Sequence, residues 1–162
     1  MRIRDILDPA RIVLDLAPGP KKAILTQLAE TVAATHRSVD QSRLVDVLQK
    51  REETSTTAIA DGIAIPHGKM ALGEEVVCAF GRSQEGVDFQ SVDGKPTHLF
   101  FLLVSPESHP SLHLRWLAHV AVLLKNPELR RALLDAKSAH DVLAAMAAEE
   151  EARTASQSAD GQ

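Results

Sequence analysis

Histidines are the residues of this chain best suited to chemistry near neutral pH, because an imidazole can serve there as a nucleophile, a proton carrier or a metal ligand. The seven histidines are His36, His67, His98, His109, His113, His119 and His140. His36 and His140 fall near predicted helix ends, and His98 leads into an apolar segment. We expect surface or structural roles for those three, which leaves the other four as candidates.

Three of those candidates, His109, His113 and His119, lie close together in the sequence and raise the question of a metal site. On a helix His109 and His113 share a face, but His119 does not, and Pro110 places His109 at the very start of that helix. Zinc sites need three or four converging ligands. The sequence therefore predicts no metal site.

The fourth candidate, His67, has an unusual local setting. Pro66 fixes its own φ and keeps Ile65 out of the helical region, so residues 63–65 are predicted to be extended and His67 lies where that strand ends. Gly68 follows and leaves the imidazole open to approach. Such a histidine can act on a group brought to it, but a histidine that only fills a turn fits this local pattern equally well.

Other enzyme signatures are missing from the sequence. It has no glycine-rich phosphate loop, no Gly-x-Ser-x-Gly elbow and no His-Glu-x-x-His helix. Cys78, the only cysteine, lies inside a predicted buried strand, where a thiol usually behaves as a small inert apolar group. We expect neither cysteine catalysis nor a bound cofactor.

Composition narrows the classes of partner. The 162 residues carry a net charge of −4, with 44% apolar and 25% charged residues, which fits one soluble domain without the basic excess of a nucleic-acid binder. With no Tyr, one Trp and four Phe, the composition argues against a large permanent interface and fits brief docking better. No apolar run approaches the roughly 20 residues of a membrane span, and the start does not resemble a signal peptide. We expect a cytoplasmic protein without membrane insertion.

In the first half of the sequence, the residue pattern predicts short strands and helices. Residues 12–16 read as a strand, and a helix with an apolar stripe follows from Pro20 to about Thr35. A second helix is predicted from Asp40, its N-cap, to about residue 51 or 52. Residues 54–62 are polar and rich in small and β-branched types, so we expect an ordered loop there.

The second half predicts a sheet buried between helices. Residues 76–80 and 99–104 are almost continuously apolar, as in strands covered on both faces, and the turn at Asp93-Gly94 between them predicts an antiparallel pair. Helices are expected at 110–125, 127–135 and 139–148, followed by a disordered acidic tail at 149–162. The expected fold class is α/β, a small mixed β-sheet with helices on both faces.

A family resemblance rests on residues 51–69, which read REETSTTAIADGIAIPHGK. This run is similar to the signature of the fructose/mannitol-type enzyme IIA domains of the bacterial phosphotransferase system, with its Arg-Glu pair, glycine-containing loop and Ile-Ala-Ile-Pro-His block. Later blocks follow in the family's order: VDF at 87–89, DGKP at 93–96, FLLVSPE at 101–107 and His-Leu at 113–114. The resemblance spans residues 2 to 148, so we expect a IIA type-2 domain at 1–148, most like the stand-alone nitrogen-regulatory branch.

The resemblance assigns roles to four residues. His67 would be the phosphoryl acceptor, loaded by a histidine-phosphorylated carrier of the HPr type, and Arg51 would stabilise the phosphate. His113 matches the family's second active-site histidine, and Thr57 would offer the phosphate a hydroxyl. Two other readings stay open: Arg51 as a surface charge, and His113 as a core histidine on the apolar stripe of its helix.

One departure from the family pattern concerns the loop before His67. The family usually has glycines where this chain has Ala58 and Ala60, and only Gly62 remains. If those positions need φ above zero, alanine would be strained and the loop would follow a different path.

The resemblance leaves three functions open. The leading one is a regulatory phosphocarrier that signals to target proteins, such as kinases or potassium transport systems, through the phosphorylation state of His67. The second is a sugar-specific IIA component that passes phosphate to a IIB domain. The third is a non-catalytic binding module that has lost the relay. None of them implies a free-standing metabolic reaction, a metal or a cofactor.

Overall fold

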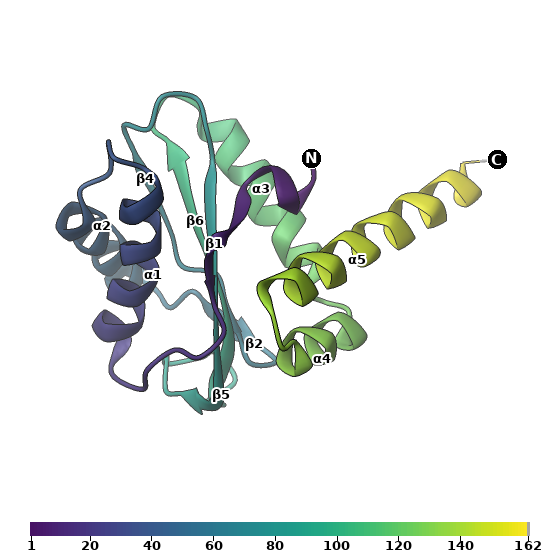
Figure 1. Cartoon of the computed structure of the whole chain (residues 1–162), viewed down its shortest axis with the longest axis horizontal. Coiled ribbons are helices and arrows are strands. Elements are labelled where there is room, and N and C mark those ends of the chain that lie inside the picture. The colour runs from purple at the N-terminus through teal and green to yellow at the C-terminus, as the bar shows by residue number, and fades with distance from the viewer. Residues whose placement is uncertain (162) are drawn as a thin grey trace.

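A sheet flanked by helices forms the body of the protein in the computed structural model, which describes residues 1–161 (Figure 1). The elements in chain order are η1 (Ile3–Asp5), β1 (Leu7–Val13), α1 (Lys21–Thr35), α2 (Gln41–Thr54), β2 (Ala58–Ala60), β3 (Ile63–Ala64), β4 (His67–Met70), β5 (Val77–Val87), β6 (Thr97–Pro106), α3 (Pro110–Leu123), α4 (Pro127–Asp135) and α5 (Ala139–Asp160).

The six-stranded sheet is mixed, as the sequence predicts. Its order is β1-β5-β6-β3-β2, and β4 also pairs with β6. The long central strands β5 and β6 are antiparallel, whereas β1 runs parallel to β5, and β3 and β4 run parallel to β6. The antiparallel pair follows from the short connection through Asp93-Gly94, since parallel neighbours need a crossover.

Each face of the sheet carries its own apolar core. Successive side chains of a strand point to opposite faces, so the continuous apolar run of β6 serves both. Phe101 stacks edge-on with Phe80 in the core under α3, α4 and α5, with ring centroids 4.9 Å apart. Its neighbour Phe100 meets Phe89 at 5.1 Å in the core under α1 and α2. Figure 1 shows these two helical layers on either side of the sheet, which confirms the expected α/β class.

The sequence of helix α2 explains where this helix begins and which of its faces is buried. Asp40 caps it by accepting a hydrogen bond of 2.8 Å from the backbone N–H of Arg43. Leu44, Val45 and Leu48 are buried against the sheet and α1, as their helical spacing predicts. The helix ends at Thr54, which leaves Arg51 in its last turn.

Strand boundaries depart from the predictions near both ends of the sheet. The first strand is Leu7–Val13, whereas residues 12–16 were the expected strand. Residues 58–60 form β2 inside the segment expected to be a loop, and His67 begins β4 instead of merely ending a strand. Such short strands exist because long-range pairing with β3 and β6 supplies their hydrogen bonds, which no local pattern records.

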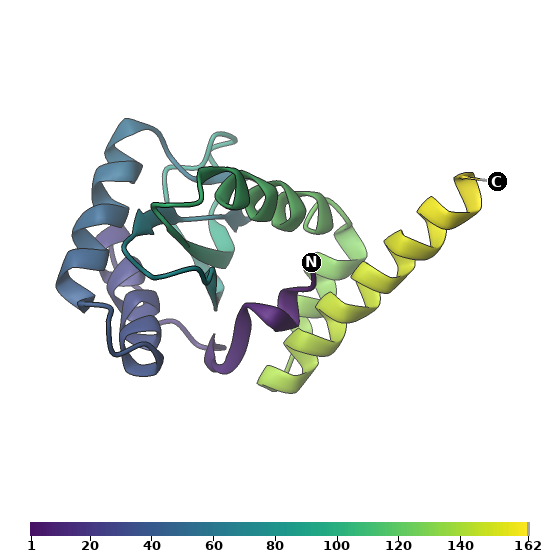
Figure 2. The same cartoon turned by 90° about the horizontal axis from the view of Figure 1, so that it is seen from above.

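Residues 149–160 are helical, which corrects the disordered tail expected at 149–162 over that range; residue 162 lies outside the described residues. Helix α5 continues to Asp160 and projects away from the body of the molecule (Figure 2). The segment has no large apolar side chain to bury, but Ala, Glu, Gln and Arg are good helix formers. Adding residues to a helix already nucleated by packing at Val142 and Met146 needs no new nucleation step.

Candidate active site

His67 is held where β4 enters the sheet beside β6. Its Cα is in register with that of Leu103, whose N–H donates to the carbonyl of Pro66 at 2.9 Å. Gly68 lets α2 pack directly over this strand, because a Cβ at that position would lie 2.7 Å from Cγ1 of Val47. The Pro-His-Gly sequence therefore fixes the backbone of the histidine and brings the end of α2 next to it.

The partners of the His67 ring define its neutral tautomer. Nδ1 lies 2.8 Å from the carbonyl oxygen of Ile65, which only accepts, so Nδ1 carries the proton. Nε2 lies 3.1 Å from Nε of Arg51, which only donates, so Nε2 presents its lone pair. The ring is thus arranged as a nucleophile that would react at Nε2.

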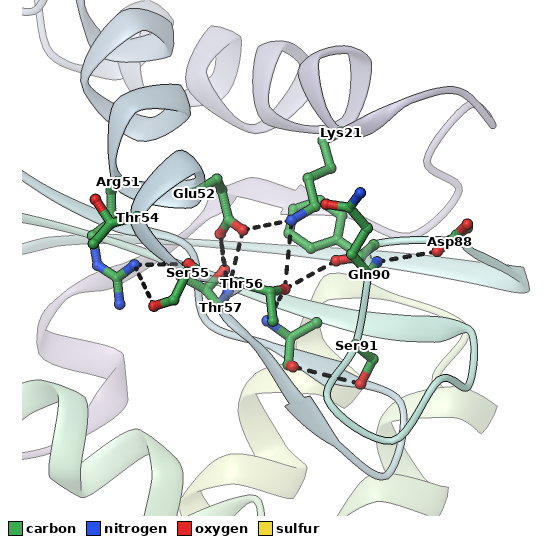
Figure 3. Close-up of polar contacts among 12 residues, drawn as sticks. Lys21, Arg51, Glu52, Thr54, Ser55, Thr56, Thr57, Asp88, Gln90 and Ser91 are labelled. Carbon is green, nitrogen blue, oxygen red and sulfur yellow. Dashed lines mark hydrogen bonds and ion pairs between the residues drawn. The ribbon is translucent and has the colours of Figure 1, made fainter.

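Arg51 brings to this site a guanidinium that does not use all of its hydrogen-bond donors. Besides the bond to His67, its Nη1 donates to the carbonyl of Ser55 at 2.9 Å and lies 3.4 Å from Oγ of the same residue (Figure 3). Within residues 1–161, Nη2 makes no hydrogen bond and Arg51 forms no ion pair. A half-exposed cation with free donors beside a nucleophile is suited to an incoming anion.

His113 reaches the same place from the first turns of α3. Its ring centroid lies 5.3 Å from that of His67, with the planes tilted by 52°. The side chain is only 5% exposed, and Nδ1 lies 2.7 Å from Oγ of buried Ser105 on β6. His113 is therefore both a buried residue and an immediate neighbour of His67.

Electrostatics keeps both imidazoles neutral at pH 7. Burial lowers the pKa of His67 below its usual value, with smaller lowering effects from Arg51 and Lys69 and opposing effects from the Ile65 carbonyl and Glu52. Burial lowers the pKa of His113 further, to about 4, with help from the neighbouring His67, Lys69 and Arg51. A cationic ring has no free lone pair, so these shifts keep the nucleophile available.

Thr57 does not lie where the sequence placed it. Its hydroxyl and its N–H both donate to the carboxylate of Glu52, and the residue is only 4% exposed (Figure 3). Because the hydroxyl proton is already committed to a carboxylate, we withdraw the phosphate contact expected of Thr57.

The alanines of the preceding loop fit their positions. Ala58 and Ala60 belong to β2 and neither has a positive φ. The left-handed conformations fall instead on Asp61, at φ 58°, and Gly62, at φ 77°. The backbone strain expected for alanine therefore does not arise. The positive φ angles fall after Ala60, on the two residues that connect β2 to β3.

The only cysteine and two of the other histidines make structural contacts outside the candidate site. Cys78 is fully buried, and its burial raises the pKa of the thiol to about 12. Nδ1 of His98 lies 3.0 Å from the carbonyl of Ser83, and His119 pairs with Glu150 at 2.7 Å. Among residues 1–161, no three histidine, cysteine or acidic side chains converge on a position for a metal ion, and no helix is long and apolar enough to cross a bilayer.

Two residues of this site were missed by sequence reasoning. Ser105 sits in a strand whose apolar character hides its contact with His113. Glu52 left a detectable signal: an acid in the last turn of a helix opposes the helix dipole, so its presence next to Arg51 needs a reason.

The chain is similar to known proteins along most of its length. Residues 5–149 match the family model described as "Phosphoenolpyruvate-dependent sugar phosphotransferase system, EIIA 2". A nitrogen regulatory protein of Bradyrhizobium diazoefficiens is 38% identical over 147 residues, which cover 89% of this chain and 95% of that protein. The fructose-specific EIIABC component of Bacillus subtilis is 34% identical over 138 residues, covering 85% of this chain but only 22% of that protein.

A solved structure agrees with the sequence relatives. The crystal structure of nitrogen regulatory protein IIA-Ntr from Neisseria meningitidis superposes with a TM-score of 0.83 at 33% identity, covering 89% of this chain and 98% of that one. The resemblance drawn from residues 51–69 is thereby confirmed, as is the fold that it implies. With its family model matched from residue 5 to residue 149, the chain belongs to the EIIA type-2 family of the phosphotransferase system.

Proposed function

We propose that this chain is a regulatory phosphocarrier whose His67 accepts a phosphoryl group from the phosphohistidine of an HPr-type protein. The observation that carries the proposal is the pair of hydrogen bonds on the ring: Nδ1–H to the Ile65 carbonyl at 2.8 Å, and Arg51 Nε–H to Nε2 at 3.1 Å. They leave a neutral imidazole with its lone pair beside a cation, as a phosphoryl acceptor requires.

The transfer step exchanges one nitrogen–phosphorus bond for another. The lone pair on Nε2 of His67 forms a bond to phosphorus while the bond in the donor breaks, and that electron pair returns to the donor ring. His67 keeps the proton on Nδ1, so its ring becomes positively charged as the bond forms. The Ile65 carbonyl oxygen faces that charge at 2.8 Å. The exchange balances without a further reactant, so catalysis consists of positioning and charge stabilisation.

Arg51 and His113 complete the proposed site. Arg51 gives up its bond to Nε2 as the phosphoryl group arrives, and its guanidinium turns onto the phosphate oxygens, where Nη2 adds a donor. His113 lies beside the acceptor ring at the N-terminal end of α3, where the helix dipole favours a dianion.

Signalling follows from the change in charge. The phosphoryl group carries nearly two negative charges, which the positive charge of the His67 ring offsets only in part, and the added charge changes the proteins that can dock there without refolding the domain. The relatives in Bradyrhizobium and Neisseria, whose names describe nitrogen regulation, support a regulatory output. Target proteins such as kinases or potassium transport systems belong to this proposal.

The second candidate is a sugar-specific component that passes the phosphoryl group to a IIB domain. The fructose-specific relative in Bacillus subtilis favours it, because the same region there belongs to a longer transport protein. A fructose-type IIB domain mixed with the phosphorylated chain separates the two: rapid transfer to IIB supports the sugar component, and a stable phosphorylated chain supports the regulator. The third reading, a module without a relay, loses its argument because Ala58 and Ala60 are unstrained.

Loading of the purified chain by a phosphorylated HPr-type carrier tests the proposal. Intact-mass measurement should show a gain of one phosphoryl group that is lost in acid, and His67→Ala should abolish the gain. The matched control is His140→Ala, since His140 is exposed and distant from these contacts in the sequence. Wild-type protein without the gain, or His67→Ala with an equal gain, would overturn the proposal.

A further inference from the structure

Glu52 is a buried acid that the transfer step does not use. The residue is 8% exposed and lies in the last turn of α2, where the helix dipole disfavours a negative charge. Burying a carboxylate is unfavourable unless it is paired and hydrogen-bonded. Its place in the structure therefore calls for compensating contacts and for a role that justifies them.

The compensating contacts bind Glu52 to the loop that follows α2. Its two carboxylate oxygens accept the N–H of Thr57 at 3.3 and 3.1 Å, and one also accepts the Thr57 hydroxyl. Lys21 from the start of α1 donates to the carboxylate at 2.8 Å and supplies the opposite charge (Figure 3). The carboxylate thus ties the loop to both helices on this face of the sheet.

Lys21 is itself held in place. Its ammonium lies 4.7 Å from the centre of the Phe89 ring and 3.4 Å from Oγ1 of Thr56, which in turn donates to the Phe89 carbonyl at 3.0 Å. A cation over an aromatic face is attracted to it. The charge pair is therefore part of a packed arrangement and not a loose surface contact.

A chain of hydrogen bonds connects Glu52 to the reactive ring. Thr57, held by Glu52, accepts the N–H of Ile65 on its carbonyl at 3.0 Å. The carbonyl of Ile65 then accepts Nδ1–H of His67 at 2.8 Å. The group that fixes the tautomer of His67 is therefore a backbone carbonyl whose own position is set through Thr57.

We propose that Glu52 is a positioning residue for phosphoryl transfer: through Thr57 and Ile65 it holds His67 with the proton on Nδ1 and the lone pair on Nε2. The inference rests on the proposed function of His67 and adds a residue to it. The negative charge of Glu52 also favours the positive ring that forms when Nε2 bonds to phosphorus. In agreement with this, Glu52 raises the pKa of His67 against the larger lowering effect of burial.

Glu52→Gln tests the proposal in the unphosphorylated protein. The side chain keeps its size but loses its charge and its full capacity to accept from Thr57. With ¹⁵N-labelled histidine, wild-type His67 should show a protonated Nδ1 and an unprotonated Nε2, and the variant should gain signals of the opposite tautomer and a lower His67 pKa. Phosphorylation by an HPr-type carrier should slow about tenfold, since small displacements of a reacting group have effects of that order.

Glu53→Gln is the matched control, because Glu53 is adjacent, acidic and exposed. It should leave the ring signals and the rate as in wild type. If Glu52→Gln fails to fold, Thr57→Val removes only the hydroxyl contact and should move the ring signals in the same direction by a smaller amount.

The outcomes separate this inference from the proposed function. A folded Glu52→Gln protein with wild-type ring signals and pKa overturns the positioning role, as does a folded Thr57→Val protein without any shift when Glu52→Gln does not fold. A wild-type chain that accepts no phosphoryl group overturns the proposed function, yet the ring signals still decide what Glu52 does to His67.

Discussion

Two arginines at opposite parts of the fold use the same guanidinium differently. Arg82 on β5 is 5% exposed and donates to four backbone carbonyls, those of Leu14, Leu133, Leu134 and Ala136. Three of these carbonyls lie at the C-terminal end of α4, where a cation also complements the helix dipole. Arg51 uses the same two nitrogens, Nε and Nη1, but divides them between the His67 ring and Ser55.

The difference separates an arginine of the scaffold from one of the site. Among the residues that the structure describes, only one of the four carbonyls, that of Leu134, has another side-chain donor, Gln84, so moving Arg82 would leave the other three without a side-chain donor. Arg51 bonds to the proposed phosphoryl acceptor, whose lone pair the proposed transfer step must release, and its guanidinium is suited to exchanging that bond for phosphate oxygens. Both side chains donate from Nε and Nη1, so the kind of acceptor distinguishes the two: backbone carbonyls for Arg82, and for Arg51 an imidazole nitrogen and Ser55.

Replacing Arg51 should have the largest effect on transfer. Arg51→Ala removes a charged donor to the developing phosphoryl group, so the rate of phosphorylation should fall by about 100-fold. The free energy of unfolding should change little, since the side chain is half-exposed. Rapid-quench phosphorylation and urea unfolding measure the two quantities, and an unchanged rate would make Arg51 a surface charge.

Replacing Arg82 should produce the opposite result. Arg82→Met keeps the apolar stem but leaves the carbonyls at the end of α4 without their donor, so the free energy of unfolding should fall by about 2 kcal/mol. At a temperature where the variant remains folded, its phosphorylation rate should equal that of wild type. A slow but fully stable Arg82→Met protein would break the distinction between the two arginines.

A change of pH should alter the transfer rate less than either arginine replacement alters its own measured quantity. Protonation of Nε2 removes the lone pair, and burial together with Arg51 lowers the pKa of His67, so the ring stays reactive below the usual histidine value. An unshifted imidazole would lose about fourfold in rate between pH 8 and pH 6. The second-order rate constant should fall by less than that, and a full fourfold loss would show that the site does not lower this pKa.

Much of the site was predictable because its residues occupy a short stretch of sequence. Pro66, His67 and Gly68 constrain one another locally, and Arg51 ends a helix whose cap and apolar spacing are visible in the sequence. The strands β2 and β4 were not predictable in the same way, because their few residues gain order only from pairing with distant strands.

The misplaced role of Thr57 and the overlooked Glu52 share one cause. The family resemblance assigned the Thr57 hydroxyl to the phosphate, but the loop folds back so that Thr57 donates to Glu52 at the end of α2. The direction in which a loop side chain points depends on contacts made elsewhere, here on Lys21 at the start of α1.

The sequence by itself determined the fold class, the helices up to residue 148, the identity of the candidate nucleophile and the family. Those features follow from local propensities, apolar periodicity and one short motif, all of which act over a few neighbouring residues. Only the tertiary structure decided the tautomer of His67, the contact between His67 and His113, and the separate uses of Arg51 and Arg82. These features depend on which carbonyls, rings and helix ends come into contact in the folded protein. Most of the residues involved are far apart in the sequence, so no local sequence pattern predicts those contacts.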